Sequence, residues 1–79
     1  MADPNEIAAL KASFRGAIGT AAALLALQEK VEGIDPAAEI AASDLEELAR
    51  VTAAHAIASA ALRGLVVTMM ARRGVSAPG

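Results

Sequence analysis

Apolar residues recur at helical spacing along two long segments of the chain. In the first segment the large apolar residues fall on one line of a helix with 3.6 residues per turn. They are Ile7, Phe14, Ile18 and Leu25. In the second segment the apolar positions form a similar seam with one histidine at its centre. They are Leu48, Val51, Leu62, Leu65, Val66 and Met69, with His55 between them. No stretch alternates with period two, so the pattern predicts an all-α fold.

The first predicted helix covers about residues 4–32. Asp3 is a suitable N-cap, and Pro4 fits the first helical position, where no amide donor is needed. Gly33 is the stop signal at its end. The expected helix is thus about 29 residues long.

The second predicted helix covers about residues 44–73. Ser43 and Glu46 have the spacing of a capping box, in which each side chain binds the other residue's amide. Gly74 follows two arginines and suits a left-handed C-terminal turn.

A connection over 33–43 separates the two helices. Asp35 and Pro36 resemble another helix start, so a short helix over 36–42 is possible. The sequence leaves open whether this segment continues into the second helix, although the capping box favours a kink before it.

A short connection between two long helices predicts an antiparallel hairpin. We expect one domain over 3–74, followed by a disordered tail over 75–79. Folding about residue 38 aligns residues whose numbers sum to about 76. This register sets Phe14 opposite Leu62, and Leu25 opposite Val51.

The middle of this hairpin carries almost no charge, because residues 16–27 and 51–62 lie side by side in the expected register. A helix that is apolar all round is normally buried all round, and two helices cannot cover each other completely. A chain of 79 residues without cysteine is also marginally stable alone. We therefore predict a homodimer that forms a four-helix bundle. The expected seam of the core or dimer comprises Phe14, Ile18, Leu25, Leu48, Val51, His55, Leu62 and Met69.

Charges are distributed unevenly along the expected rod. Acidic residues predominate from 28 to 50, near the connection, and basic residues predominate at the other end. An antiparallel dimer would set each acidic end beside a basic end, although solvated helix faces explain the same pattern. At the basic end, Lys11, Arg15 and Arg63 are the predicted binding surface for an acidic protein partner.

His55 admits three interpretations. It could be a core histidine held by Thr52, Ser59 or Thr20, or a pH-sensitive group at a dimer seam. The third is a phosphoryl-accepting histidine, because residues 55–64 resemble the histidine-bearing helix of histidine phosphotransfer domains.

In that resemblance Ile57, Ser59 and Gly64 match an aliphatic residue, a small residue and a glycine. Ala58 departs from the pattern, because such domains have a basic residue there. The resemblance implies phosphotransfer through His55, without the basic residue that would steady the phosphoryl group.

Composition excludes several other functions. A net charge of −2 argues against nucleic-acid binding, which depends on neutralising phosphates. One histidine and no cysteine predict no metal site, and no nucleophile has a base at recognisable spacing. Residues 16–28 and 51–62 are too short to span a bilayer, and Arg63 interrupts the longer apolar stretch.

These observations predict a cytoplasmic, non-enzymatic protein–protein interaction module without cofactors. Such a module could act as an adaptor, a chaperone or an inhibitor of a larger protein complex. The alternatives are a histidine phosphotransfer protein using His55 and a small membrane-active helical protein.

Overall fold

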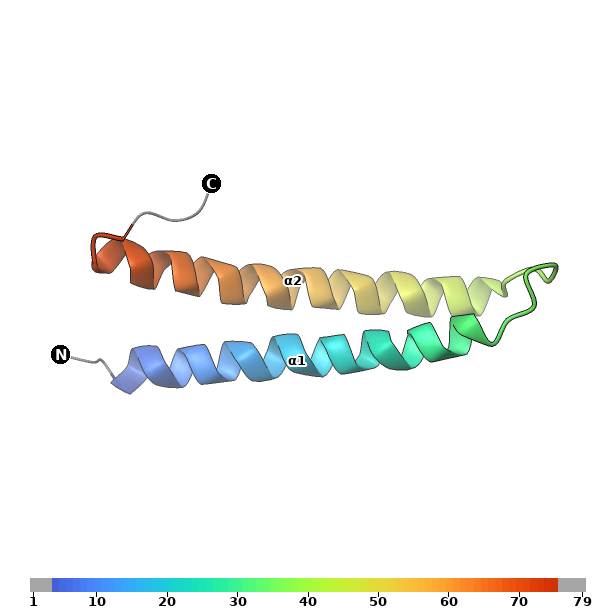
Figure 1. Cartoon of the computed structure of the whole chain (residues 1–79), viewed down its shortest axis with the longest axis horizontal. Helices are drawn as coiled ribbons and strands as arrows, with labels where there is room; N and C mark the ends of the chain where they lie inside the picture. Colours follow the sequence, from blue (N-terminus) through green and yellow to red (C-terminus); the bar gives the residue numbers. More distant parts are fainter. Residues whose placement is uncertain (1–3, 76–79) are drawn as a thin grey trace.

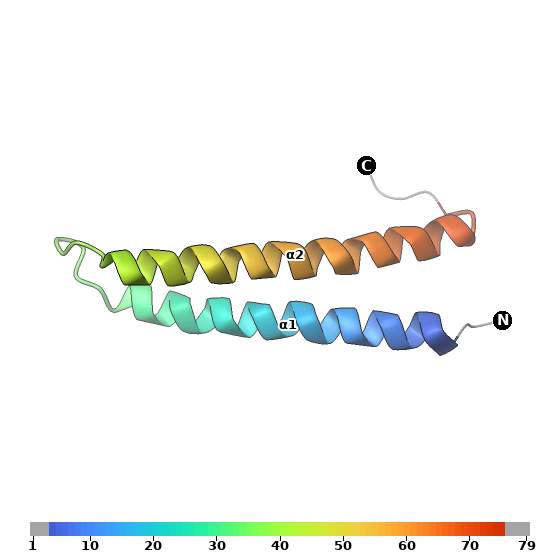
Figure 2. The same ribbon diagram turned by 180° about the vertical axis from the view of Figure 1, so that it is seen from behind.

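The structure, a computed structural model, describes residues 4–75 as two long antiparallel helices (Figure 1). Helix α1 spans Pro4–Glu32 and α2 spans Ala42–Arg72. Seen from the opposite side, the helices again lie side by side along their length (Figure 2). The prediction of an all-α hairpin is confirmed. The expected Asp3 cap and residues 76–79 of the expected tail over 75–79 lie outside the described residues.

Side-chain contacts between the helices show the register. Lys30 pairs with Asp44 near the connection, Thr20 contacts His55 at mid-length, and Glu6 pairs with Arg72 at the far end. The residue numbers of these pairs sum to 74, 75 and 78, close to the expected 76.

The contact between the helices follows heptad spacing, with intervals of three and four residues. On α1 the residues at least partly covered at these intervals are Leu10, Ser13, Ala17, Thr20, Leu24 and Leu27. On α2 they are Asp44, Leu48, Val51, His55, Ala58, Leu62, Leu65 and Met69. This spacing is typical of coiled-coil packing. Among residues 4–75 only Ala17 and Leu27 are buried, each still 8% exposed, so the core of a single hairpin is small.

The contact face of α1 differs from the expected one. Phe14, Ile18 and Leu25 are 49%, 64% and 58% exposed, whereas the α2 residues of the expected core or dimer seam (Leu48, Val51, His55, Leu62 and Met69) are all partly buried. The face of α1 toward α2 is centred on Ala17 and flanked by leucines. Small side chains such as that of Ala17 let two helices approach closely. This explains why α1 packs against α2 through the Ala17 face and leaves its larger side chains outside the contact.

The connection is a loop without a short helix. The Asp35 carboxylate accepts a hydrogen bond from the amide of Ala37 at 2.9 Å, and the Asp35 carbonyl accepts one from Ala38 at 2.9 Å. These two bonds close a turn that does not propagate.

Helix α2 begins two residues earlier than predicted, and the capping box does not form. Its N-cap is Ala41, which makes no side-chain capping bond, so Ser43 lies inside the first turn. Asp44 lies in the first turn of α2, where its carboxylate interacts favourably with the positive end of the helix dipole. Asp44 also reaches Lys30 from this position, at 2.8 Å.

The C-terminal end of α2 matches its prediction. Gly74 has a φ of 70°, in the left-handed region that favours glycine. Its amide bonds the Ala71 carbonyl at 3.2 Å, and the Val75 amide bonds the Met70 carbonyl at 2.9 Å. The two bonds form a Schellman motif.

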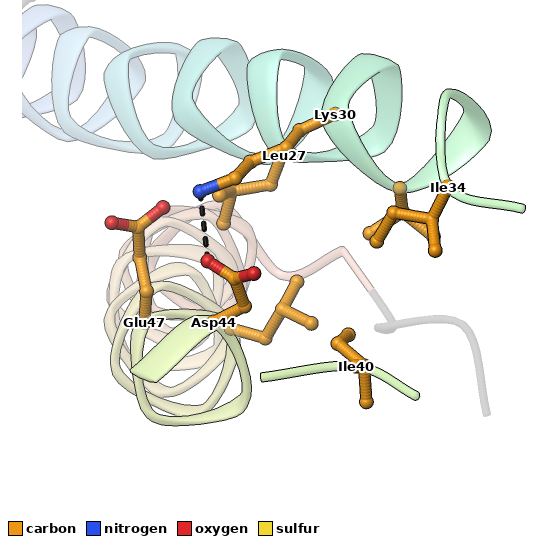
Figure 3. Close-up of a pocket in the computed structure, with 8 residues that line it drawn as sticks. Leu27, Lys30, Ile34, Ile40, Asp44 and Glu47 are labelled. Carbon is orange, nitrogen blue, oxygen red and sulfur yellow. Dashed lines mark hydrogen bonds and ion pairs between the residues drawn. The ribbon is translucent and has the colours of Figure 1, made fainter. Parts of the chain in front are cut away.

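Apolar side chains close the hairpin at the connection (Figure 3). Ile34 and Ile40 from the loop lie beside Leu27 of α1 and Leu48 of α2. The space they enclose is about 10 Å³, roughly enough for one water molecule. This end is therefore a packed closure rather than a ligand site.

Candidate functional site

The largest apolar side chains of α1 lie outside the hairpin contact. We call Ile7, Phe14, Ile18 and Leu25 the apolar stripe. They occupy one line of the helix, rotated about 80° from the face centred on Ala17. Ile7 is 38% exposed and the other three are more exposed. Within a single hairpin these side chains face solvent.

Helix α2 carries two open hollows near its C-terminal end. The first, of about 250 Å³, lies between Leu10 of α1 and a mainly apolar part of α2. The second, of about 270 Å³, lies along α2 and is lined by Ser59, Leu62, Arg63, Val66, Val67 and Met70. Val66 and Met70 line both hollows, so the two form one continuous surface.

The stripe and the hollows share one side of the molecule. Leu10 is rotated only about 60° from the stripe around the axis of α1, between the stripe and the face centred on Ala17. Because Leu10 shares a hollow with Val66 and Met70, these α2 residues border the same side. We call this combined surface the open face. The outer side of α2 carries one large apolar residue, Ile57, which is 72% exposed.

The uncovered area is large for a chain of this length. The accessible surface is 5817 Å². Scaling of surface with mass predicts about 4,400 Å² for a compact monomer of this size. The excess of about 1,400 Å² exceeds the roughly 800 Å² that each partner buries in a standard interface.

The three predicted partner-binding cations remain available on the surface. Lys11, Arg15 and Arg63 are exposed, and within residues 4–75 none of them forms an ion pair. Arg63 lines the second hollow, at the edge of the open face. Arg15 and Arg63 lie at similar heights in the observed register.

His55 lies in the seam between the helices as part of a polar cluster. Its Nδ1 atom is 2.8 Å from the Thr20 hydroxyl, and its Nε2 atom is 3.3 Å from the Ser59 hydroxyl. Thr20 also donates to the Ala17 carbonyl at 3.0 Å. The direction of both contacts follows the imidazole tautomer: with Nδ1 protonated, the Thr20 oxygen accepts from Nδ1–H and Nε2 accepts from the Ser59 hydroxyl.

Two of the three expected hydroxyl partners of His55 are therefore present. Thr52 is not one of them, because it donates to the backbone carbonyl of Leu48 at 2.7 Å. A phosphoryl acceptor needs a ring nitrogen open to an incoming phosphate. Both nitrogens of His55 meet hydroxyls inside the seam, an arrangement that does not favour this chemistry.

Two sets of ion pairs at the ends of the hairpin were not predicted. The Glu6 side chain is only 7% exposed and accepts from Arg72 at 3.1 Å and from Arg73 at 3.0 Å. At the other end, the hydrogen bond from Lys30 to Asp44 raises the pKa of Lys30 above its ordinary value of 10.5. Opposite charges at mirrored positions of the two helices are the signal that could have revealed both.

Across residues 4–75, no three histidine, cysteine, aspartate or glutamate side chains gather where they could hold a metal ion. The open face is therefore the candidate functional site.

Comparison with known proteins adds no family. No family model, curated protein or solved structure matches this chain.

Proposed function

We propose that this protein is a protein–protein interaction module that acts by self-association through its open face. The exposed apolar stripe is the observation that carries the proposal. Isolated apolar residues on a surface are ordinary, but a contiguous line of them over about 27 Å of helix marks an interaction site. A second hairpin offers a matching line, and the product is a four-helix bundle.

The excess surface supports this proposal. Covering about 1,400 Å² per chain requires a partner of at least comparable length, because a short peptide covers only part of one helix. A second copy meets this requirement and is always present at equal concentration. Homodimers also commonly form through one self-complementary patch.

The wider role that we propose is that of an adaptor, chaperone or inhibitor in the cytoplasm. Self-association uses the apolar stripe and leaves the charged rim for another protein. Lys11, Arg15 and Arg63 are exposed cations at that rim, and an acidic protein surface is their complement. Replacing all three with glutamine should weaken such a complex without changing the molecular mass of the dimer.

Sedimentation equilibrium without detergent tests self-association. The wild-type chain should sediment as a dimer. Ile18→Glu places a charge in the stripe and should shift the protein to monomer. Ile57→Glu is the matched control, because it makes the same change at the most exposed large apolar residue and should leave the dimer intact. A wild-type monomer over a wide concentration range would contradict the proposal.

A membrane-inserted hairpin is the competing function, and one observation favours it. Both helices are long and apolar enough to cross a bilayer, judged by length and composition alone. This is weak evidence, since core helices of soluble proteins pass the same test. Arg63 opposes insertion, because a charge near mid-bilayer costs about 2.5–3.5 kcal/mol on insertion scales. Flotation with phosphatidylcholine vesicles separates the two functions, since a soluble dimer stays at the bottom of the gradient.

A further inference from the structure

The spacing of the apolar stripe is symmetric along α1. Ile7 and Leu25 are each nine residues from Gly16, and Phe14 and Ile18 are each two residues from it. A two-fold axis perpendicular to α1 at this level maps the stripe onto itself with its direction reversed. The geometry points to an antiparallel dimer in which the two α1 helices pack against each other about Gly16. This inference rests on the proposed self-association and specifies its arrangement.

In this dimer each large side chain meets another. Ile7 lies level with Leu25 of the second copy, and Phe14 lies level with its Ile18. Lys11 lies level with Ala21, whose small side chain leaves room for the lysine stem to cross it and reach solvent. All four stripe residues are thereby covered by helices 8–10 Å apart.

The same axis brings small residues of α2 together. In the observed register the level of Gly16 on α1 corresponds to about residue 60 on α2. Ala56, Ser59 and Ala60 surround that level, so the two α2 helices can also approach. The hollow lined by Val66 and Met70 lies just beyond it and can receive side chains of the second copy.

Charge favours the antiparallel arrangement over a parallel one. Glu29 and Glu32 follow the stripe at its C-terminal end. In the antiparallel dimer they lie near the α1 N-terminus of the second copy, where the helix dipole is positive. A parallel dimer would instead place the acidic ends of the two α1 helices together. It would also place Lys11 beside Lys11 of the second copy.

Crosslinking of single-cysteine variants tests this arrangement, because the chain has no cysteine of its own. Ile7→Cys and Leu25→Cys proteins, one of them tagged, are treated separately and as an equimolar mixture with a short bismaleimide. In the antiparallel dimer, identical positions are 18 residues apart, about 27 Å, which the reagent cannot span. Ile57→Cys, on the outer side of α2, measures collisional background.

We expect the mixture to give several-fold more crosslinked dimer than either variant alone, and each variant alone to match the Ile57→Cys background. Sedimentation of the same variants before crosslinking, with circular dichroism to verify helicity, keeps the two proposals distinguishable. Dimers in which each variant crosslinks to itself would indicate parallel packing and overturn the inference. Dimers without crosslinks above background would indicate another face and also overturn it. Folded monomers in the wild type would refute self-association itself.

Discussion

The hydrogen bond between Thr20 and His55 predicts a specific coupling between these residues. Thr20→Val keeps the shape of the side chain and removes the hydroxyl that lies 2.8 Å from Nδ1. The imidazole then has a polar nitrogen in a partly buried seam without its partner. Leaving such a group unsatisfied costs about 1–3 kcal/mol when buried, and partial burial puts this case near 1 kcal/mol. The expected loss in melting temperature is about 4–8 °C for a domain of this size.

The double variant Thr20→Val/His55→Leu should recover most of this loss. Replacing both partners of a hydrogen bond with apolar groups is nearly neutral, because no polar atom is left unsatisfied. Thr20→Val should therefore cost about 1 kcal/mol in the wild-type background and close to nothing beside His55→Leu. Ser59→Ala serves as the comparison and should cost less, since its contact with Nε2 is longer, at 3.3 Å.

Urea unfolding followed by far-ultraviolet circular dichroism measures these differences. The chain has no tryptophan or tyrosine, so fluorescence from those residues cannot report on unfolding. All variants are compared at one protein concentration, because the proposed self-association would make apparent stability depend on concentration. An equal cost of Thr20→Val in both backgrounds would show that the hydrogen bond does not contribute, and the assigned role of His55 would be wrong.

Three further predictions concern Glu6, two glycines and Lys30. Glu6→Gln should destabilise the hairpin by about 1–2 kcal/mol in the same urea assay, because a nearly buried carboxylate loses two charge-assisted bonds. Gly74→Ala should cost about 1 kcal/mol, because its φ of 70° disfavours a side chain, whereas Gly16→Ala should stabilise by about 0.5–1 kcal/mol since nothing lies within 4 Å of the added carbon. The raised pKa of Lys30 means that its pairing with Asp44 stabilises the fold fully below pH 10.5 and is lost as pH rises through the higher folded value. The stability of Lys30→Met should therefore approach that of the wild type above that range, and a constant difference across it would contradict this assignment.

The helix lengths, the hairpin and its register follow from local signals in the sequence. Helical periodicity identified both helices, and Gly33 and Gly74 marked their ends within a residue or two. The capping box did not form, since α2 begins at Ala42 with Ala41 as its N-cap. Near this start Asp44 pairs with Lys30, an interaction between residues far apart in sequence that no local signal specifies.

The face that α1 turns toward α2 could not be read from hydrophobicity alone. Helix α1 has two apolar faces, one with large side chains and one with alanine, leucine and threonine. By hydrophobicity alone, the face with Phe14 and Ile18 would be expected to pack against α2. The face with Ala17 does so instead, because its small residue allows the backbones of the two helices to approach more closely. His55 needs Thr20, which lies on the second face, so the polar bond and the close packing select the same rotation of α1.

This choice of faces links folding to the proposed association. The seam of the hairpin contains Ser13, Thr20, His55 and Ser59 among its leucines, and the polar contacts fix its register. The side chains of the apolar stripe stay outside this seam, where a single chain does not cover them. In the proposed dimer their burial would add to the hydrophobic stabilisation of the hairpin seam. The polar seam therefore sets which residues α1 exposes, and in the proposed dimer the exposed stripe would make the second chain part of the fold.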